Sequence, residues 1–175
     1  MVKLIILDVY GTILKSDGRL DGAVRPGLEQ FMDFYRPAKI VVFTDADLER
    51  ITADLQVSGL TGKFDGVYHS EHLVSELRYK HLHSPVLRKA AMRLRGNVKD
   101  LGRVCKDFSI PKRSAIYIGD NFHGRDIKSA ELNKIRFIRV PQFRTNIPYS
   151  DDKDSFVEYD NPDNLFSFES LIGKL

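Results

Sequence analysis

The segment Lys3-Leu-Ile-Ile-Leu-Asp-Val-Tyr10 decides the fold, because it is a continuous apolar run that ends in an aspartate and a tyrosine. The run lacks a helical period, which is typical of a strand buried on both faces. A second run of this kind spans Lys39–Thr44, and between the two the apolar residues over 28–35 recur with helical spacing. Strand, helix and strand in this order predict parallel strands joined by a crossover helix.

The alternation of strands and helices continues along the chain. Apolar runs predict further strands at 66–69, 115–120 and 135–140. Helical spacing predicts further helices at 48–55 with Asp45 as the N-cap, at 87–94, and around Ile127 and Ala130. We therefore expect an α/β fold, a three-layer Rossmann-like sandwich with a mostly parallel central sheet of about five strands. The polar stretch 141–163 is predicted as a surface loop, and 166–172 as a closing helix or tail packed on the sheet.

Length and composition fit one globular domain. The 175 residues are 42% hydrophobic and 29% charged, which excludes a wholly disordered or fibrous chain. The longest apolar stretches, Leu4–Leu7 and Ile40–Phe43, are far shorter than the ~20 residues of a membrane span. The single cysteine, Cys105, excludes an internal disulfide and a thiolate metal cluster. We expect one domain over residues 1–175, located in the cytoplasm, with no membrane partner.

The charge of the chain is unevenly distributed, although the net charge is only +3. Residues 78–106 hold nine basic residues and one acid, and residues 151–175 hold seven acids and two lysines. We expect a small basic cap or insertion at 70–97 and an acidic C-terminal tail at 151–175. The basic segment fits a bulky or polyanionic partner, such as a nucleotide, a nucleic-acid end or a phosphoprotein. A solvated helix face explains it at least as well.

The carboxyl ends of three predicted strands carry Asp8, Thr44 and Asp120. Ligands of open α/β sheets bind beyond these ends of the strands. A carboxylate that ends a buried strand is costly unless water, a metal or a hydrogen bond stabilises it, so two converging carboxylates indicate a bound cation. Each of the three residues alone would serve equally well as a cap of the following turn, but the three together favour a functional site.

The same residues resemble the motifs of the haloacid dehalogenase superfamily. The matching features are Asp8-Val-Tyr-Gly-Thr12 after a strand, Thr44 at the end of the second strand, a later lysine, and Ile118-Gly-Asp-Asn121 followed by Asp126. The resemblance spans residues 3–141, and it lies in the order of the motifs and in their place at strand ends. It implies a catalytic domain with the α/β core of that superfamily.

The resemblance implies a role for each matching residue. Asp8 corresponds to the nucleophile that attacks phosphorus and forms an aspartyl-phosphate, which water then hydrolyses. Thr44 corresponds to the hydroxyl that hydrogen-bonds a phosphoryl oxygen, with backbone amides beside it. Lys99 best matches the lysine that neutralises the nucleophile and the phosphoryl group, and Arg95 and Lys106 are neighbours that would also serve.

The resemblance also implies a Mg²⁺ site. Asp8, the main-chain carbonyl of Tyr10 and Asp120 would supply oxygen ligands, which this hard ion prefers. The second acid of the family motif comes one residue earlier than in this chain, where Asp126 follows Asp120 by six positions. Asp126 would reach the metal directly or through water, or Asn121 would replace it, or Asp126 would cap the next helix.

Tyr10 departs from the phosphatases of the superfamily, which carry an aspartate two residues after the nucleophile as acid and base. A tyrosine resembles the dehalogenase branch, in which no leaving alcohol needs a proton. Dehalogenases, however, lack the metal acid that Asp120 would supply. In addition, only 31 residues separate Thr12 from Thr44, too few for the helical cap of dehalogenases.

The residues and the resemblance together favour one function over two alternatives. We expect a Mg²⁺-dependent phosphatase, capless or with a small cap, that acts on a phosphorylated substrate through Asp8. The first alternative is dehalogenase-like hydrolysis of non-phosphate bonds, which Tyr10 alone favours. The second is a catalytically silent binding module that keeps the fold and holds a partner with the basic segment.

Overall fold

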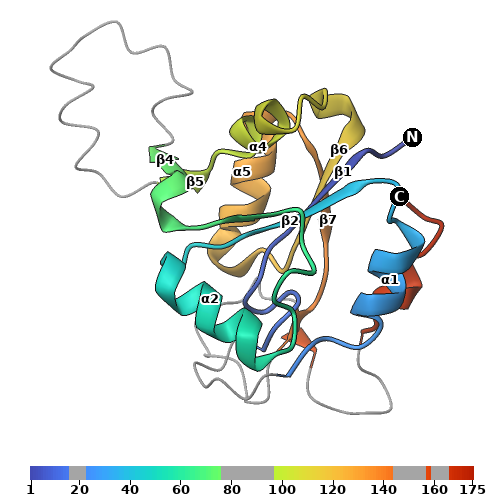
Figure 1. Cartoon of the computed structure of the whole chain (residues 1–175). Coiled ribbons are helices and arrows are strands. Elements are labelled where there is room, and N and C mark those ends of the chain that lie inside the picture. The colour runs from blue at the N-terminus through green and yellow to red at the C-terminus, as the bar shows by residue number, and fades with distance from the viewer. Residues whose placement is uncertain (16–22, 76–96, 144–156, 159–165) are drawn as a thin grey trace, which may run out of the picture.

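Five parallel strands form the central sheet, in the order β3-β2-β1-β6-β7 (Figure 1). The strands are β1 (Leu4–Leu7), β2 (Lys39–Phe43), β3 (Gly66–Tyr68), β6 (Ala115–Gly119) and β7 (Arg136–Arg139). This computed structural model describes residues 1–15, 23–75, 97–143, 157–158 and 166–175. The five strands predicted from apolar runs are confirmed, and the two central ones, β1 and β6, are buried along their whole length.

The register of the sheet aligns the carboxyl ends of the central strands. Leu7, the last residue of β1, lies opposite Val42 of β2 and Ile118 of β6. The chain therefore leaves these three strands at the same edge, where the polar residues predicted for the site follow. The strand order runs outward from β1 to β3 on one side and from β6 to β7 on the other. The edge above β1 and β6 is thus a topological switch point, the usual place of a ligand site in such sheets.

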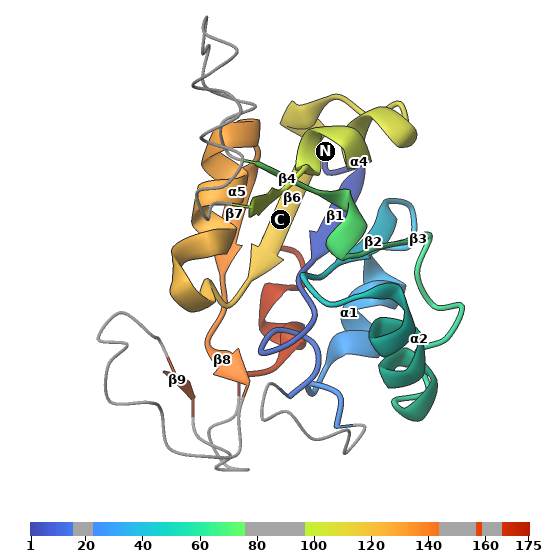
Figure 2. The same ribbon diagram turned by 90° about the vertical axis from the view of Figure 1, so that its left-hand side faces the viewer.

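Helices cover both faces of the sheet (Figure 1 and Figure 2). They are α1 (Leu28–Phe34) and α2 (Leu48–Val57) on one face, and α4 (Leu101–Asp107) and α5 (Arg125–Asn133) on the other. The side chains of β1 alternate between the two apolar cores, so that Ile5 packs beneath α1 and α2 whereas Ile6 packs beneath α4 and α5. The predicted three-layer sandwich is confirmed.

Shorter elements complete the described part of the chain. An antiparallel pair joins β4 (Leu73–Ser75) to β5 (Asn97–Lys99), and a parallel pair joins β8 (Gln142–Phe143) to β9 (Val157–Glu158). The 3-10 helices are η1 (Ser70–His72), η3 (Lys112–Ser114), η4 (Phe122–Gly124) and η5 (Phe168–Leu171). The ring of Phe168 in η5 packs 5.1 Å from that of Phe31 in α1, so the predicted closing segment is a 3-10 helix on the α1 side.

The structure corrects three local predictions. The N-cap of α2 is Asp47 rather than Asp45, because the Asp47 side chain accepts a hydrogen bond from Arg50 N at 2.8 Å. Helix α4 is not among the predicted elements, although its buried residues Leu101, Val104 and Cys105 recur with helical spacing. The predicted surface loop at 141–163 begins with Gln142 and Phe143, which are buried and paired in β8.

Other predicted segments fall outside the described residues. These are the predicted helix at 87–94, residues 76–96 of the basic cap, and residues 151–156 and 159–165 of the acidic tail. None of the described helices is long and apolar enough to cross a membrane.

Candidate active site

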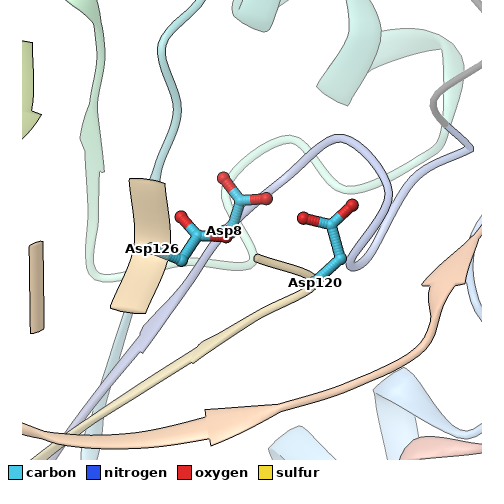
Figure 3. A group of neighbouring side chains, drawn as sticks. All are labelled: Asp8, Asp120 and Asp126. Atoms are coloured by element: carbon cyan, nitrogen blue, oxygen red, sulfur yellow. The ribbon is translucent and has the colours of Figure 1, made fainter. Parts of the chain in front are cut away.

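Three buried carboxylates meet at the carboxyl edge of the sheet (Figure 3). Asp8 follows β1, Asp120 follows β6, and Asp126 lies in the first turn of α5. One oxygen of each side chain lies within 4.8 Å of the others. The structure thus brings together three of the residues that the sequence proposes as metal ligands.

Asp8 is 7% exposed, and both of its carboxylate oxygens have partners. Thr12 Oγ1 donates a hydrogen bond to Oδ2 at 3.1 Å, and Lys99 Nζ forms an ion pair with Oδ1. The Thr12 hydroxyl also accepts a hydrogen bond from Asp120 N at 3.0 Å. Thr12 therefore joins the loop after β1 to the end of β6 and fixes the relative position of Asp8 and Asp120.

Lys99 is the centre of a buried network of hydrogen bonds. Its Nζ donates to Asp126 Oδ1 at 3.1 Å and to the Tyr117 hydroxyl at 2.7 Å, in addition to its ion pair with Asp8. The Tyr117 hydroxyl in turn donates to Asp126 Oδ1. Lys99 is 4% exposed, so its charge is stabilised by these partners rather than by water.

Lys99 contacts Asp8 from the end of β5, and it does not lie on a solvated helix face. Lys106 and Arg95 are the two other basic residues considered for this role. Lys106 lines a separate cavity beside α4. Arg95 lies outside the described residues.

Asp120 presents a free carboxylate oxygen to the loop after β1. Phe122 N donates to Asp120 Oδ1 at 3.0 Å, whereas the buried Oδ2 has no hydrogen-bond partner. Gly11 has φ +80°, and a Cβ built there would lie 2.1 Å from Asp120 Oδ2. Glycine at this position is therefore required both by the left-handed backbone and by the close approach of the loop to Asp120.

The charged forms of two carboxylates of the cluster, Asp8 and Asp120, are destabilised. Burial raises the pKa of Asp8 to about 6, and Asp126 adds to this shift while Lys99 opposes it. Burial, Asp8 and Asp126 together raise the pKa of Asp120 to about 8. Burial disfavours the charged form of Lys99, but Asp126 and Asp8 outweigh it and hold the pKa of Lys99 above its usual range. The site thus concentrates negative charge where a divalent cation would stabilise it.

Backbone amides engage both candidates for the fourth metal ligand. Asn121 has φ 63°, a left-handed conformation that asparagine tolerates, and its N donates to Asp126 Oδ2 at 2.9 Å. Asn121 Oδ1 accepts a hydrogen bond from Ile127 N at 3.0 Å. Among the described residues, Asp120 Oδ2 is therefore the carboxylate oxygen of the cluster that has no protein partner.

A cavity of about 420 Å³ opens above the cluster. Its lining includes Asp8, Thr44, Lys99, Asp120 and Asp126, as well as Tyr10. Thr44 follows β2 and is 1% exposed, and its Oγ1 accepts a hydrogen bond from Ala46 N at 3.2 Å. The predicted nucleophile, hydroxyl and cation thus share one cavity with four of the residues predicted as metal ligands, whereas the fifth, Asn121, is not among the lining residues.

Tyr10 is anchored to α2. Its hydroxyl donates to Asp54 Oδ2, and the guanidinium of Arg50 lies over its ring with Cζ 4.7 Å from the ring centroid. Arg50 Nε also lies 3.8 Å from Asp54 Oδ2. Asp54 is 2% exposed, so Tyr10 supplies one of the few polar contacts available to this carboxylate.

Arg25 is a buried side chain that forms hydrogen bonds with the loop after β1. It is 1% exposed, and its Nε donates to Thr12 O at 2.5 Å. Its Nη2 donates to Gly11 O at 2.9 Å and to Pro141 O at 2.5 Å. Arg25 therefore ties the loop that carries the Asp8 region to the segment after β7.

The sequence motifs do not indicate Asp54, Arg50 or Tyr117. On a helix, an aspartate four residues after an arginine is typical of a surface ion pair, and nothing in the sequence shows that Asp54 is buried. Tyr117 offers one usable signal, since a tyrosine inside an otherwise aliphatic buried strand needs a partner for its hydroxyl. The partner itself, Asp126, cannot be identified without the packing of α5.

Comparison with known proteins identifies the fold. No family sequence model matches the chain, and no curated protein matches it. The chain is similar to a haloacid dehalogenase superfamily hydrolase of subfamily IA from Geobacter sulfurreducens, with TM-score 0.53 and 14% identity over 82% of this chain and 94% of that chain. It is also similar to a predicted phosphoglycolate phosphatase from Haemophilus somnus, with TM-score 0.55 and 13% identity over 89% and 95% of the two chains.

A third similar structure is a haloacid dehalogenase-like hydrolase from Xanthomonas campestris, with TM-score 0.56 and 14% identity over 92% of this chain and 91% of that chain. At such identities the likeness shows the fold alone. The chain has the fold of the haloacid dehalogenase superfamily, as its motifs imply.

Proposed function

We propose that this chain, which has the haloacid dehalogenase fold, is a Mg²⁺-dependent phosphohydrolase that acts through an aspartyl-phosphate on Asp8. One observation carries the proposal: the buried cluster of Asp8, Asp120 and Asp126 with Lys99 paired to Asp8, at the base of a cavity beyond the strand ends. Such a cluster is costly to folding, and strongly perturbed carboxylates in a cleft are typical of functional sites. The structural likeness to a predicted phosphoglycolate phosphatase supports a phosphate ester as the substrate.

The residues of the cluster fit a divalent cation. Asp120 Oδ2 is buried without a partner, and the raised pKa values of Asp8 and Asp120 reflect charge that the protein alone does not neutralise. Asp8, Asp120 and the main-chain carbonyl of Tyr10 would hold Mg²⁺, with Asp126 behind them as the partner of Lys99. The bound ion would neutralise these carboxylates and stabilise negative charge on the phosphoryl group.

Each residue of the site has its own role in the proposed reaction. Asp8 attacks the phosphorus of a phosphate monoester, the bond from phosphorus to the leaving oxygen breaks, and the leaving group takes its proton from water. Water then attacks the phosphorus of the aspartyl-phosphate, which releases inorganic phosphate and restores the Asp8 carboxylate. Lys99 would stabilise the charge that passes between Asp8 and the phosphoryl group, and the Thr44 hydroxyl would bind a phosphoryl oxygen.

Tyr10 favours a second candidate function. Its hydroxyl is engaged with Asp54, so the residue that follows Asp8 by two positions supplies no carboxyl group for a leaving alcohol. Displacement of a halide needs no such proton, and dehalogenase-like hydrolysis is therefore the alternative reaction. Chloride release from a 2-haloacid would indicate this alternative, and the absence of turnover with both substrate classes would indicate a silent binding module.

The proposed function also bears on the organisation of the chain. Residues 1–175 would act as one catalytic domain, and the basic residues over 78–106 would meet a phosphorylated or polyanionic substrate. Lys99, one of these basic residues, lines the candidate cavity. The placement of Lys99 supports an anionic substrate.

The first test uses 4-nitrophenyl phosphate with Mg²⁺ or with EDTA. We expect turnover in Mg²⁺ only, and a loss of several orders of magnitude in kcat for Asp8→Asn, because the amide keeps the shape of the side chain but cannot attack phosphorus. Asp33→Asn is the matched control, since Asp33 lies on α1 with a 66% exposed side chain. Full activity in a folded Asp8→Asn protein would contradict the proposal.

A further inference from the structure

Two arginines line the candidate cavity in addition to Lys99. Arg50 comes from α2 and Arg125 is the first residue of α5, so they approach the cavity from opposite faces of the sheet. Their side chains are 54% and 50% exposed, in contrast to the buried Lys99. Both guanidinium groups are therefore accessible to a ligand that enters the cavity from solvent.

The position of Arg50 is fixed by Tyr10 and Asp54. Its Cζ lies 4.7 Å from the centroid of the Tyr10 ring, and its Nε lies 3.8 Å from Asp54 Oδ2. A guanidinium over an aromatic ring is attracted to the face of the ring, and its N–H donors remain available for hydrogen bonds. Arg50 is thus oriented on the cavity wall before any ligand binds, which lowers the entropy cost of pairing with an anion.

Arg125 is oriented by an ion pair. Its Nη1 lies 2.5 Å from Asp45 Oδ2, and Asp45 also lines the cavity. The pair is partly exposed, so its net contribution to stability is small. The planar fork of an arginine carries five donors, and one carboxylate does not use all of them. Arg125 can therefore bind a second anion without first giving up Asp45.

A phosphoryl group on Asp8 does not account for these two arginines. The groups that would bind it are Lys99, the Thr44 hydroxyl and a divalent cation, all at the base of the cavity. The cavity measures about 420 Å³, which leaves room for a leaving group between Asp8 and the solvent. The walls of this cavity include Arg50 and Arg125.

We propose that Arg50 and Arg125 bind a second anionic group, so that the substrate is a phosphate monoester whose leaving group itself carries a carboxylate or a phosphate. This assignment rests on the proposed function, since it takes the phosphoryl group to sit on Asp8. Guanidinium groups match both anions, because each offers two oxygens to the fork of donors.

The experiment measures binding separately from turnover. Three phosphonates that cannot be hydrolysed are titrated into the full chain in Mg²⁺ by calorimetry: 4-carboxyphenylphosphonate, 1,4-phenylenebisphosphonate and 4-carbamoylphenylphosphonate. The first and third have nearly the same size and differ in one charge. We expect at least one of the two anionic probes to bind ~10-fold more tightly than the carbamoyl probe, as a charge-assisted hydrogen bond would give. The tighter of the two identifies the second anion.

Variants connect this preference to the two arginines. Arg50→Met and Arg125→Met should each lower the ratio of affinities for the anionic and carbamoyl probes by ~5-fold or more, and Arg50→Lys should keep part of the preference. Arg36→Met is the matched control, because Arg36 is an exposed arginine paired with Asp33 outside the cavity. Melting curves of all variants confirm that they are folded.

Three results would overturn the assignment: equal affinity for the three probes, no binding of any probe, or a ratio unchanged in both Arg50→Met and Arg125→Met. The experiment also distinguishes failure of this assignment from failure of the proposed function. If the anionic probes are preferred through the arginines but 4-nitrophenyl phosphate is not hydrolysed, the second anion site stands and the hydrolase does not. If 4-nitrophenyl phosphate is hydrolysed through Asp8 but the probes bind equally, the hydrolase stands and the second anion site does not.

Discussion

The phenol of Tyr10 is held as a hydrogen-bond donor. It donates to Asp54, and burial together with this carboxylate raises the pKa of Tyr10 above its ordinary value of 10.0. A phenol with a raised pKa keeps its proton at neutral pH and is a poor acid for a leaving alkoxide. We therefore expect the leaving group to depart with little help from the protein.

This residue predicts a preference among substrates. Aryl phosphates, whose leaving groups need little protonation, should be hydrolysed much faster than alkyl phosphates. Tyr10→Asp would supply a positioned acid and base, a group that contributes ~10²–10⁴-fold, and should help alkyl phosphates more than aryl ones. The measurement is kcat/KM for both ester classes in the wild type and in Tyr10→Asp.

The new carboxylate of that variant would face Asp54, so the double variant Tyr10→Asp with Asp54→Asn is the control for charge repulsion. Folding and Mg²⁺ binding of both variants are checked first. If the wild type shows no leaving-group preference and the variants slow both ester classes alike, then Tyr10 does not occupy the place of an acid and base.

Tyr117 predicts a second effect at the residue scale. Tyr117→Phe keeps the buried ring but removes the hydroxyl between Lys99 and Asp126, so the ammonium loses one of its hydrogen bonds. We expect a loss of ~1–3 kcal/mol in the free energy of unfolding and a fall in kcat of ~10-fold or more, with a smaller change in KM. Chemical denaturation and steady-state kinetics measure the two effects.

Tyr68→Phe is the matched control for this substitution. Its hydroxyl donates to Asp107 Oδ2 at 3.0 Å, and Tyr68 does not line the candidate cavity. The control should lose some stability but keep kcat. An equal kcat for Tyr117→Phe and the wild type would show that the hydroxyl does not position Lys99.

At the scale of elements, the close approach of the loop after β1 to Asp120 lets us predict the effect of adding one methyl group at Gly11. Gly11→Ala would place a Cβ 2.1 Å from Asp120 Oδ2 at φ +80°. The loop or Asp120 must then move, so we expect a lower melting temperature and the loss of any stabilisation by Mg²⁺. Differential scanning fluorimetry with Mg²⁺ and with EDTA measures both.

Gly59→Ala separates backbone strain from the clash. Gly59 has φ +70°, and a Cβ built there would meet no atom within 4 Å. Strain of this kind costs ~1–2 kcal/mol, so Gly59→Ala should be destabilised but should keep its response to Mg²⁺. If Gly11→Ala responds to Mg²⁺ as the wild type does, Asp120 is not a ligand of the ion.

The five sheet strands are predictable because each coincides with a short apolar run in the sequence. The positions of Asp8 and Asp120 follow from those strands, because the carboxyl ends of parallel neighbours meet at one edge. The N-cap of α2 is less predictable, since Asp45 and Asp47 are both suitable and only the backbone conformation distinguishes them. Asp45 instead forms an ion pair with Arg125. The two residues are far apart in the sequence, so no local pattern predicts this pair.

The order of the family motifs predicts the role of Lys99, whereas the spacing of the residues around it does not. Its agreement with the order of the family motifs singles it out, although the sequence around it is equally typical of a solvated helix face. The structure places it in β5, a strand of only three residues, which is too short to leave a period. The links from Tyr10 to Asp54 and from Tyr117 to Asp126 depend on helix packing and are invisible in the sequence.

For the whole molecule, the carboxylate cluster predicts how stability depends on pH. Asp8 and Asp120 have folded pKa values of about 6 and about 8, above the ordinary 3.8. The folded state therefore binds their protons more tightly than the unfolded state, and this stabilisation is complete below about pH 4 and is lost as the pH rises towards 8. In EDTA, the melting temperature should fall across this range.

The expected fall is at least ~2–4 °C, which corresponds to ~1 kcal/mol for a domain of this size. Mg²⁺ should reduce it, because the cation stabilises the charged forms of the two carboxyl groups. Asp120→Asn should also reduce it, whereas the exposed Asp33→Asn should not. A melting temperature in EDTA that stays constant or rises between pH 5 and pH 8, equally in the wild type and Asp120→Asn, would contradict the raised pKa values.

The brace formed by Arg25 has a consequence for synthesis on the ribosome. Its guanidinium joins the loop after β1 to Pro141, which lies 116 positions after Arg25, and Lys99 pairs with Asp8 across 91 positions. At translation rates of ~5–20 residues per second, the first strand waits on the order of ten seconds before these partners emerge. During this interval the apolar strand β1 lacks its neighbour β6, and the carboxylate of Asp8 lacks its cation. The candidate active site is therefore among the last parts of the nascent protein to form, and a chain that stalls before β6 emerges exposes an apolar strand to which chaperones can bind.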